Sequence, residues 1–326
     1  MKRELEWRTV RPEEVEGKGW QNTLAPFDRL PAHARETVPP SVWDLSHHSA
    51  GLRLRFMTAS PRIGVRWSVG GNLAMPHMAA TGVSGVDLYR REDHKRWRFV
   101  GVGQPRQQQA NEATFPGASN GPTEFLLYLP LYNSTTSLEI GLEGGMPLLA
   151  PPRTRAPIVF YGTSITQGGC ASRTGMAFTA IAARQLDRSH INLGFSGSGK
   201  MEPALAELLG ELDASVFVLD CLRNMNENMV RERMEPFVSL LRKKRPRTPI
   251  LCAGDIFLDN PKESPLSRIT RESVERLRRS GVSAVHYLPM RGAWGDDGEG
   301  TVDGVHPTDL GMSRQAAVFA RALRCF

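Results

Sequence analysis

Cysteine is scarce in this 326-residue chain, and its four copies lie far apart. They form no CxxC pair and show no zinc-like spacing, so the patterns of a zinc finger and of a disulfide-stapled domain are missing. We expect reduced thiols, as in a cytoplasm. Cys170 is expected to be a small space-filling residue and not a nucleophile.

Long apolar runs are missing as well. No stretch approaches the ~20 apolar residues that a membrane-spanning helix needs. The first residues, 1–6, are not followed by the apolar segment of a secretory signal. We therefore expect a cytoplasmic location and no membrane partner.

Neither sign of charge dominates the chain. Lysine and arginine number 41 against 34 acidic residues, a formal charge of +7, and the basic residues are spread over both halves. A nucleic-acid surface needs clustered basic residues interleaved with aromatic ones. The densest basic runs, 242–245 and 276–279, fall at the ends of predicted helices, where cations suit the helix dipole. We expect no nucleic-acid partner; a binder of that kind would show salt-sensitive affinity.

Hydrophobic and polar residues alternate through residues 43–142, the pattern of half-buried antiparallel strands. The clearest segments are 52–56 and 63–69. Further strands are predicted at 86–89, 97–100, 124–129 and 137–142, with Gly- and Pro-rich turns between them. Residues 1–150 are thus predicted to form an antiparallel β-sandwich of jelly-roll type with an extended N-terminal segment. The pattern leaves open whether the first ~40 residues wrap the second domain or stay loose.

A different rhythm begins after a Gly- and Pro-rich connector at 144–153. Apolar strands and amphipathic helices then alternate, which favours a parallel sheet covered by helices on both faces. Residues 151–326 are therefore predicted to be an α/β domain. The predicted strands are 158–161, 190–195, 215–221, 249–253 and 282–288, and the predicted helices lie near 175–186, 202–212, 227–244, 266–279 and 307–323.

Candidate catalytic residues follow the strands of this second domain. Ser164, Gly197 and Asn224 come after the first, second and third strands, where parallel sheets form ligand sites. Asp303 and His306 precede the last helix and can reach the same edge. A serine becomes nucleophilic when an imidazole takes its proton and an acid fixes the tautomer of that imidazole. The backbone N–H groups of Ser164 and Gly197, with the Asn224 amide, can serve as an oxyanion hole.

In this order, the blocks that carry Ser164, Gly197, Asn224 and the pair Asp303 and His306 resemble the SGNH (GDSL-type) hydrolase superfamily over residues 155–326. The resemblance implies a flavodoxin-like, three-layer α/β/α domain and a Ser-His-Asp triad that hydrolyses short-chain acyl esters without a metal or other cofactor. Residues 85–89, GVDLY, look like the GxDLY signature of an N-terminal β-domain found in one subgroup of these esterases.

Two positions depart from the pattern of the superfamily. Thr163 stands where an aspartate is usual, and the block around Asn224 lacks the usual glycine and acid. Asn226 and Asn228 compete for the role of Asn224. Ser164 can also be an ST-turn residue, and Asp303 can be a turn or cap residue, but their joint order favours catalysis. Thr163 is kept as a candidate substrate-binding residue.

The segment from Met75 to Met78 is predicted to lean over the cleft, because Met and Pro suit an adaptable wall for an acyl group. Met75 and His77 are therefore candidate substrate-binding residues, and no histidine is expected to bind a metal. The predicted function is a serine esterase for a short acyl group such as acetyl, with a small molecule or a carbohydrate as the alcohol portion. An acyltransferase and a non-catalytic carbohydrate-binding protein are the alternatives, and the oligomeric state is open.

Overall fold

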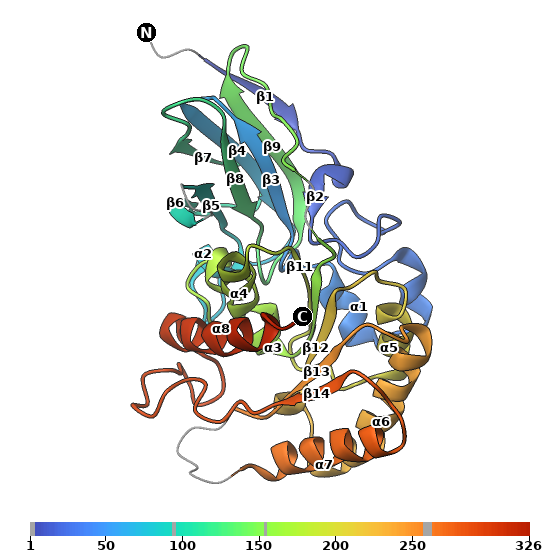
Figure 1. Ribbon diagram of the computed structural model, residues 1–326. Helices are drawn as coiled ribbons and strands as arrows, with labels where there is room; N and C mark the ends of the chain where they lie inside the picture. Colours follow the sequence, from blue (N-terminus) through green and yellow to red (C-terminus); the bar gives the residue numbers. More distant parts are fainter. Residues whose placement is uncertain (1–3, 93–95, 153–154, 257–262) are drawn as a thin grey trace.

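The computed structural model describes residues 4–92, 96–152, 155–256 and 263–326. Two regions are visible in Figure 1: a stack of antiparallel strands and a parallel sheet flanked by helices. Among the described helices, none is both long and apolar enough to cross a bilayer.

The N-terminal region is a sandwich of two antiparallel sheets, as predicted. One sheet has the order β1-β9-β4-β7 and the other β2-β3-β8-β5-β6. Alternate side chains of each sheet, such as Val65 and Trp67 on one and Leu54 and Phe56 on the other, point into a shared core. The strands are β1 (Leu5–Thr9), β2 (Val15–Glu16), β3 (Arg53–Thr58), β4 (Arg62–Val69), β5 (Val86–Arg91), β6 (Trp97–Gly103), β7 (Asn111–Pro116), β8 (Thr123–Tyr128) and β9 (Thr135–Glu143).

The second region is built on a parallel sheet of order β11-β10-β12-β13-β14, which confirms the predicted flavodoxin-like arrangement. Its strands are β10 (Ile158–Gly162), β11 (His190–Gly194), β12 (Val216–Asp220), β13 (Ile250–Ala253) and β14 (Val285–Leu288). The helices are α3 (Ser164–Gln167), α4 (Phe178–Leu186), α5 (Pro203–Leu209), α6 (Glu227–Lys244), α7 (Pro265–Arg279) and α8 (Asp309–Leu323).

Both faces of this sheet are buried, which explains why its strands are almost continuously apolar. Along β10, Val159 and Tyr161 enter a core with α5, α6 and α7. Their neighbours Ile158 and Phe160 enter a second core with α4 and α8 on the opposite face. Because successive side chains of a strand point to opposite faces of the sheet, one apolar run packs against both layers of helices.

The N-terminal segment wraps the second domain, which answers the question left open by the sequence. It includes α1 (Pro40–Ser46), and Trp20 joins the core on the α5 side of the sheet. Arg29 is buried and donates from Nη1 to the carbonyl oxygens of Asn192 (3.2 Å) and Gly194 (2.7 Å) on β11. Arg53 donates to the carbonyl oxygen of His190, on the same strand, at 2.9 Å. Residues that are far from β11 in the sequence thus cover this outer strand of the sheet.

The GVDLY segment joins the two regions. Asp87 is fully buried and accepts hydrogen bonds from Arg173 Nη1 (2.6 Å) and the Gly175 backbone N–H (2.9 Å). Arg173 also donates to the hydroxyl of Tyr89 at 2.6 Å. Burial raises the pKa of Asp87, while the charge of Arg173 opposes that shift. The motif therefore fixes the turn after α3 to the β-domain.

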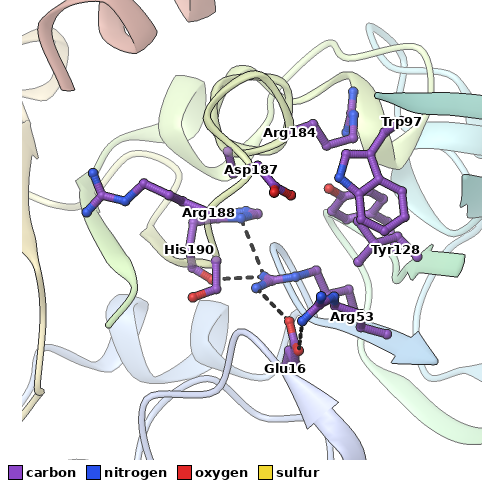
Figure 2. Close-up of a pocket in the computed structure, with 12 residues that line it drawn as sticks. Glu16, Arg53, Trp97, Tyr128, Arg184, Asp187, Arg188 and His190 are labelled. Carbon is purple, nitrogen blue, oxygen red and sulfur yellow. Dashed lines mark hydrogen bonds and ion pairs between the residues drawn. The ribbon is translucent and has the colours of Figure 1, made fainter. Parts of the chain in front are cut away.

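A small polar cavity lies on the same interface (Figure 2). Arg53, Trp97, Asp187 and His190 are among its lining residues, and its volume is about 30 Å³. That volume holds about one water molecule. The cavity is therefore too small for an ester substrate, and the functional site has to lie elsewhere.

Candidate functional site

Ser164 is the first residue of the short helix α3, directly beyond the C-terminal end of β10. The turn before it is tight. A Cβ on Gly162 would meet Thr166 Oγ1 at 2.2 Å and the Asp220 carbonyl oxygen at 2.4 Å, so glycine is required there. Thr163 caps the helix, because its Oγ1 accepts from the Ile165 N–H at 3.2 Å. The local chain thereby holds the Ser164 side chain at the edge of the sheet.

The structure brings Ser164, His306 and Asp303 into one hydrogen-bonded chain. Ser164 Oγ lies 3.0 Å from His306 Nε2, and His306 Nδ1 lies 2.8 Å from Asp303 Oδ2. Since an ionised carboxylate only accepts hydrogen bonds, Nδ1 carries the proton and Nε2 is left to accept from the serine. This order of nucleophile, base and orienting acid can perform acyl transfer.

Asp303 is held by its own turn as well as by the imidazole. Its Oδ1 accepts from the backbone N–H groups of Val305 (2.9 Å) and His306 (2.7 Å). Burial would raise the pKa of Asp303, but the hydrogen bonds from His306 and Val305 outweigh burial and lower the pKa to about 2. The carboxylate is therefore ionised throughout the neutral range.

The candidate oxyanion donors lie on loops beyond β11 and β12. Gly197 has a φ of +68°, which favours glycine, and the space where a Cβ would project is open to 4 Å. Asn224 ends the 3-10 helix η5 (Leu222–Asn224), and its Nδ2 donates to the Ser198 carbonyl oxygen. An amide nitrogen carries two hydrogens, so one is left for an oxyanion.

The competing asparagine Asn226 has a structural task. Its side chain caps α6 by accepting from the Met229 N–H at 2.9 Å. Asn228 lies inside α6 and is exposed. Of the three asparagines, only Asn224 bonds to the loop that carries Gly197.

The β-domain contributes supports that the sequence did not single out. Tyr132, beyond β8, donates from its hydroxyl to the Ser164 carbonyl oxygen at 3.0 Å. Gln167 accepts from the Ser196 N–H at 3.0 Å and lies 3.1 Å from Nδ1 of His48. Burial, followed by the charge of Arg29, lowers the pKa of His48 to about 4, so this imidazole is neutral and can accept from Gln167. These bonds tie the nucleophile turn to the loop with Gly197.

His77 and Met75 also come from the β-domain. Met75 and Met78 form a small bridge, with backbone bonds of 3.2 and 3.1 Å, and His77 lies at its tip. The ring of His77 is 5.6 Å, centroid to centroid, from that of His306. The tip of the Met75–Met78 bridge thus lies beside the candidate base.

Cys170 is buried in the turn after α3, close to the same imidazole. Burial, followed by the charge of Asp303, raises the pKa of its thiol to about 11. The thiol is thus protonated at neutral pH, whereas nucleophilic attack needs a thiolate. Ser164 is the better nucleophile at this site.

Comparison with known proteins gives two family matches that divide the chain. The model of the GDSL-like lipase/acylhydrolase family matches residues 155–324, and the model described as the N-terminus of an SGNH-hydrolase-type esterase matches residues 5–147. No curated protein matches the chain.

Solved structures resemble most of the chain or nearly all of it. The crystal structure of a GDSL-like lipase from Bacteroides ovatus is 36% identical, with 98% of each chain covered and a TM-score of 0.89. A salicylyl-acyltransferase from a tetracycline biosynthetic pathway is 22% identical, with 98% of this chain and 97% of the other covered and a TM-score of 0.80. A family two carbohydrate esterase from Clostridium thermocellum, in complex with cellohexaose, is 15% identical, with 85% and 92% covered and a TM-score of 0.63. The last two likenesses show the fold alone.

Proposed function

The chain belongs to the GDSL-like lipase/acylhydrolase family, and from this membership we propose that Ser164, His306 and Asp303 are the catalytic triad of a serine esterase for short-chain acyl esters. The observation that carries the proposal is the hydrogen-bonded chain from Ser164 Oγ through His306 to Asp303, with distances of 3.0 and 2.8 Å. Both distances fall within the range of formed hydrogen bonds.

The reaction proceeds in two halves. In the first, His306 Nε2 takes the proton of Ser164 as Oγ bonds to the ester carbonyl carbon, and the imidazolium then gives that proton to the departing alcohol. In the second, His306 takes a proton from water, the hydroxide attacks the acyl-enzyme, and the proton returns to Ser164 Oγ as the acid leaves. Asp303 keeps the proton on Nδ1 and stabilises the imidazolium in both halves.

The negative oxygen of each tetrahedral intermediate is received by three donors. They are the backbone N–H groups of Ser164 and Gly197 and the second hydrogen of the Asn224 amide. The hydrogen bond from Asn224 Nδ2 to the carbonyl oxygen of Ser198, the residue after Gly197, supports this assignment because it keeps two of the donors close together. Removal of one such donor costs about 3–4 kcal/mol of transition-state stabilisation.

The proposed substrate is a short acyl ester, such as an acetyl ester, of a carbohydrate or another small alcohol. Met75 and His77 form the proposed wall of the acyl pocket, supported by the position of His77 beside His306. The buried hydroxyl of Thr163 bonds to the backbone, so its proposed influence on substrate acts through the position of Ser164. The fold shared with family two carbohydrate esterases supports the carbohydrate, although fold analogy is a weaker argument than the site.

A second candidate function is acyl transfer to an alcohol in place of water. It uses the same acyl-enzyme, and the fold shared with a salicylyl-acyltransferase supports it. Product analysis with p-nitrophenyl acetate and added sugars separates the two functions. Acetate alone indicates hydrolysis, and an acetylated sugar that grows with sugar concentration indicates transfer.

The primary test is intact mass after treatment with a fluorophosphonate, alongside turnover of p-nitrophenyl acetate. We expect one adduct and measurable turnover in the unmodified chain, and neither in Ser164→Ala. Ser119→Ala, which alters an exposed serine in the β-domain, is the matched control and is expected to keep both. An adduct that persists in Ser164→Ala, or an unmodified chain that gives neither adduct nor turnover, contradicts the proposal. The second result favours the non-catalytic carbohydrate-binding alternative.

A further inference from the structure

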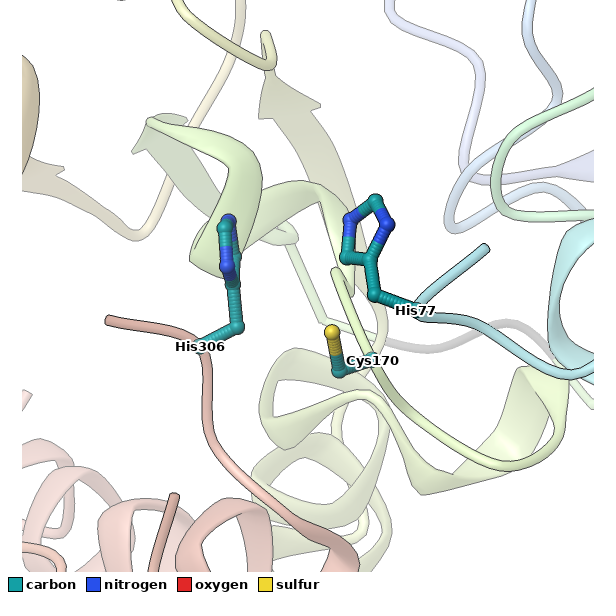
Figure 3. A group of neighbouring side chains, drawn as sticks. All are labelled: His77, Cys170 and His306. Atoms are coloured by element: carbon teal, nitrogen blue, oxygen red, sulfur yellow. The ribbon is translucent and has the colours of Figure 1, made fainter. Parts of the chain in front are cut away.

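Three side chains with metal-binding atoms meet beside Ser164: His77, Cys170 and His306. Their candidate ligand atoms all lie within 4.8 Å of one another. Figure 3 shows the Cys170 thiol between the two imidazoles, which approach from opposite sides. The ligands come from three segments: the bridge of the β-domain, the turn after α3 and the turn before α8.

One thiol and two imidazoles are ligands that zinc prefers. With zinc–sulfur and zinc–nitrogen bonds of about 2.3 and 2.0 Å, tetrahedral ligand atoms lie roughly 3.4 Å apart. The widest separation between the ligand atoms therefore has to shrink by up to about 1.4 Å for an ion to bind. His77 is the residue that can move, because it is exposed at the tip of the Met75–Met78 bridge.

The nitrogen of His306 that faces an ion is Nε2, because Nδ1 is bonded to Asp303 at 2.8 Å. A carboxylate bonded to the far nitrogen is the usual support of a zinc-bound histidine, since it fixes the tautomer and increases the basicity of the ring. The lone pair of Nε2 that accepts the Ser164 proton can therefore also bind a metal ion. It cannot do both at the same time.

The thiol of Cys170 has no part in the proposed ester hydrolysis. Cys170 also has a φ of +68°, in the left-handed region that favours glycine. Such a backbone costs of the order of 1 kcal/mol and persists only where the surroundings impose it. The turn thus holds a buried thiol next to two imidazoles at an energetic cost.

Contrary to the expectation from the sequence that no histidine binds a metal, we propose that His77, Cys170 and His306 bind a zinc ion, or another thiophilic divalent ion. The bound ion switches the esterase off by occupying Nε2 of His306. The Cys170 thiol releases its proton to solvent as the sulfur–metal bond forms, and water or Ser164 Oγ completes the tetrahedron. The inhibition rests on the proposed function, but the binding does not.

Binding is tested by titrating cobalt(II) into Ser164→Ala, which has lost the nucleophile but keeps all three ligands. We expect a thiolate-to-cobalt charge-transfer band that saturates at one equivalent and is displaced by zinc. Cys325→Ala, which removes an exposed thiol at the C-terminus, is the matched control and is expected to keep the band, while Cys170→Ala is expected to lose it. Absence of the band at saturating cobalt overturns the site.

Inhibition is tested in the chain with an intact nucleophile, by measuring p-nitrophenyl acetate turnover against buffered free zinc. Cys170→Ala is expected to keep its basal turnover and to need at least about 100-fold more zinc for half-inhibition, because a ligand is lost. His77→Gln, altered at an exposed position, is expected to shift the half-inhibition point in the same direction and serves if Cys170→Ala fails to fold. Equal zinc sensitivity of both variants and the unmodified chain overturns the switch. A cobalt band in Ser164→Ala, together with no basal turnover in the chain that keeps Ser164, would refute the esterase proposal and leave the metal site standing.

Discussion

Replacing Asp303 by asparagine tests how the candidate base is held in its working tautomer. Asp303 uses one oxygen for the backbone N–H groups of Val305 and His306 and the other for Nδ1 of His306. Asparagine has a single oxygen. If that oxygen stays with the two backbone donors, the amide NH₂ faces Nδ1, which can then only accept. The ring proton moves to Nε2, and His306 can no longer take the Ser164 proton.

Two effects of Asp303 differ enough in size to be separated. The carboxylate side chain is 38% exposed, so its attraction for the imidazolium is screened and worth about 1 kcal/mol, less than tenfold in rate. The wrong tautomer, in contrast, costs about 10⁴-fold in kcat, or roughly 5.5 kcal/mol. We therefore expect Asp303→Asn to lower kcat by at least 10³-fold.

The assay is p-nitrophenyl acetate hydrolysis at neutral pH, with thermal unfolding to verify that each variant is folded. Asp303→Ala is the informative companion, because water can accept from Nδ1 and the productive tautomer stays accessible. It should lose less activity than Asp303→Asn. A folded Asp303→Asn with less than a tenfold loss, or a smaller loss than Asp303→Ala, would refute the tautomer argument.

Three predictions concern stability. Burial raises the pKa of Asp220 from an ordinary 3.8 to about 6 although Thr166 donates to it; the folded state binds the extra proton, so stability falls as pH rises from about 4 to 6. Asp220→Asn should remove this pH dependence. In urea titrations it should raise the free energy of unfolding by up to about 3 kcal/mol at pH 7 and change it little at pH 4. Equal effects at both pH values would contradict the assignment of the raised pKa to Asp220. Asp87→Ala leaves the Arg173 guanidinium without its buried carboxylate and should lower the free energy of unfolding by about 3 kcal/mol, measured as a lower Tm. An unchanged Tm would show that this contact does not hold the domains together. Arg29→Ala leaves the carbonyl oxygens that accept from its guanidinium without a donor, and should lower the free energy of unfolding by at least about 3 kcal/mol in urea titrations. A loss below about 1 kcal/mol would mean that water replaces the side chain as the donor.

The parallel sheet and its helices could be predicted because their signals are local. The apolar runs at 158–161 and 215–221 correspond to β10 and β12, and the amphipathic stretch at 227–244 is α6. Each pattern reports the periodicity of one element, and the alternation of strand and helix permits few topologies. The order Ser164, Asp303, His306 added enough to anticipate which residues the fold brings together.

Contacts between distant segments could not be predicted. β1 and β7 were missed, because short outer strands expose most of their side chains and alternate weakly. Arg29 looked like one basic residue among many, yet it is buried against a strand 163 positions away. Cys170 and His77 had no partner nearby in sequence, since the turn after α3 and the β-domain meet only in the folded chain. The sequence therefore predicted most of the elements and the proximity of Ser164, Asp303 and His306, but not the interface between the two domains.

Arginine side chains that bond to the two outer strands of the parallel sheet hinder the pairing of these strands with another molecule. Arg29 and Arg53 occupy the carbonyl oxygens of three alternate residues of β11. At the opposite edge, Arg278 occupies the Val285 carbonyl oxygen of β14 at 2.7 Å. Unpaired strand edges are templates for pairing with another chain, and natural sheets block them with charge or covering segments. A strand from a second molecule would have to displace a guanidinium before it could add to either edge, which disfavours amyloid-like growth from this sheet.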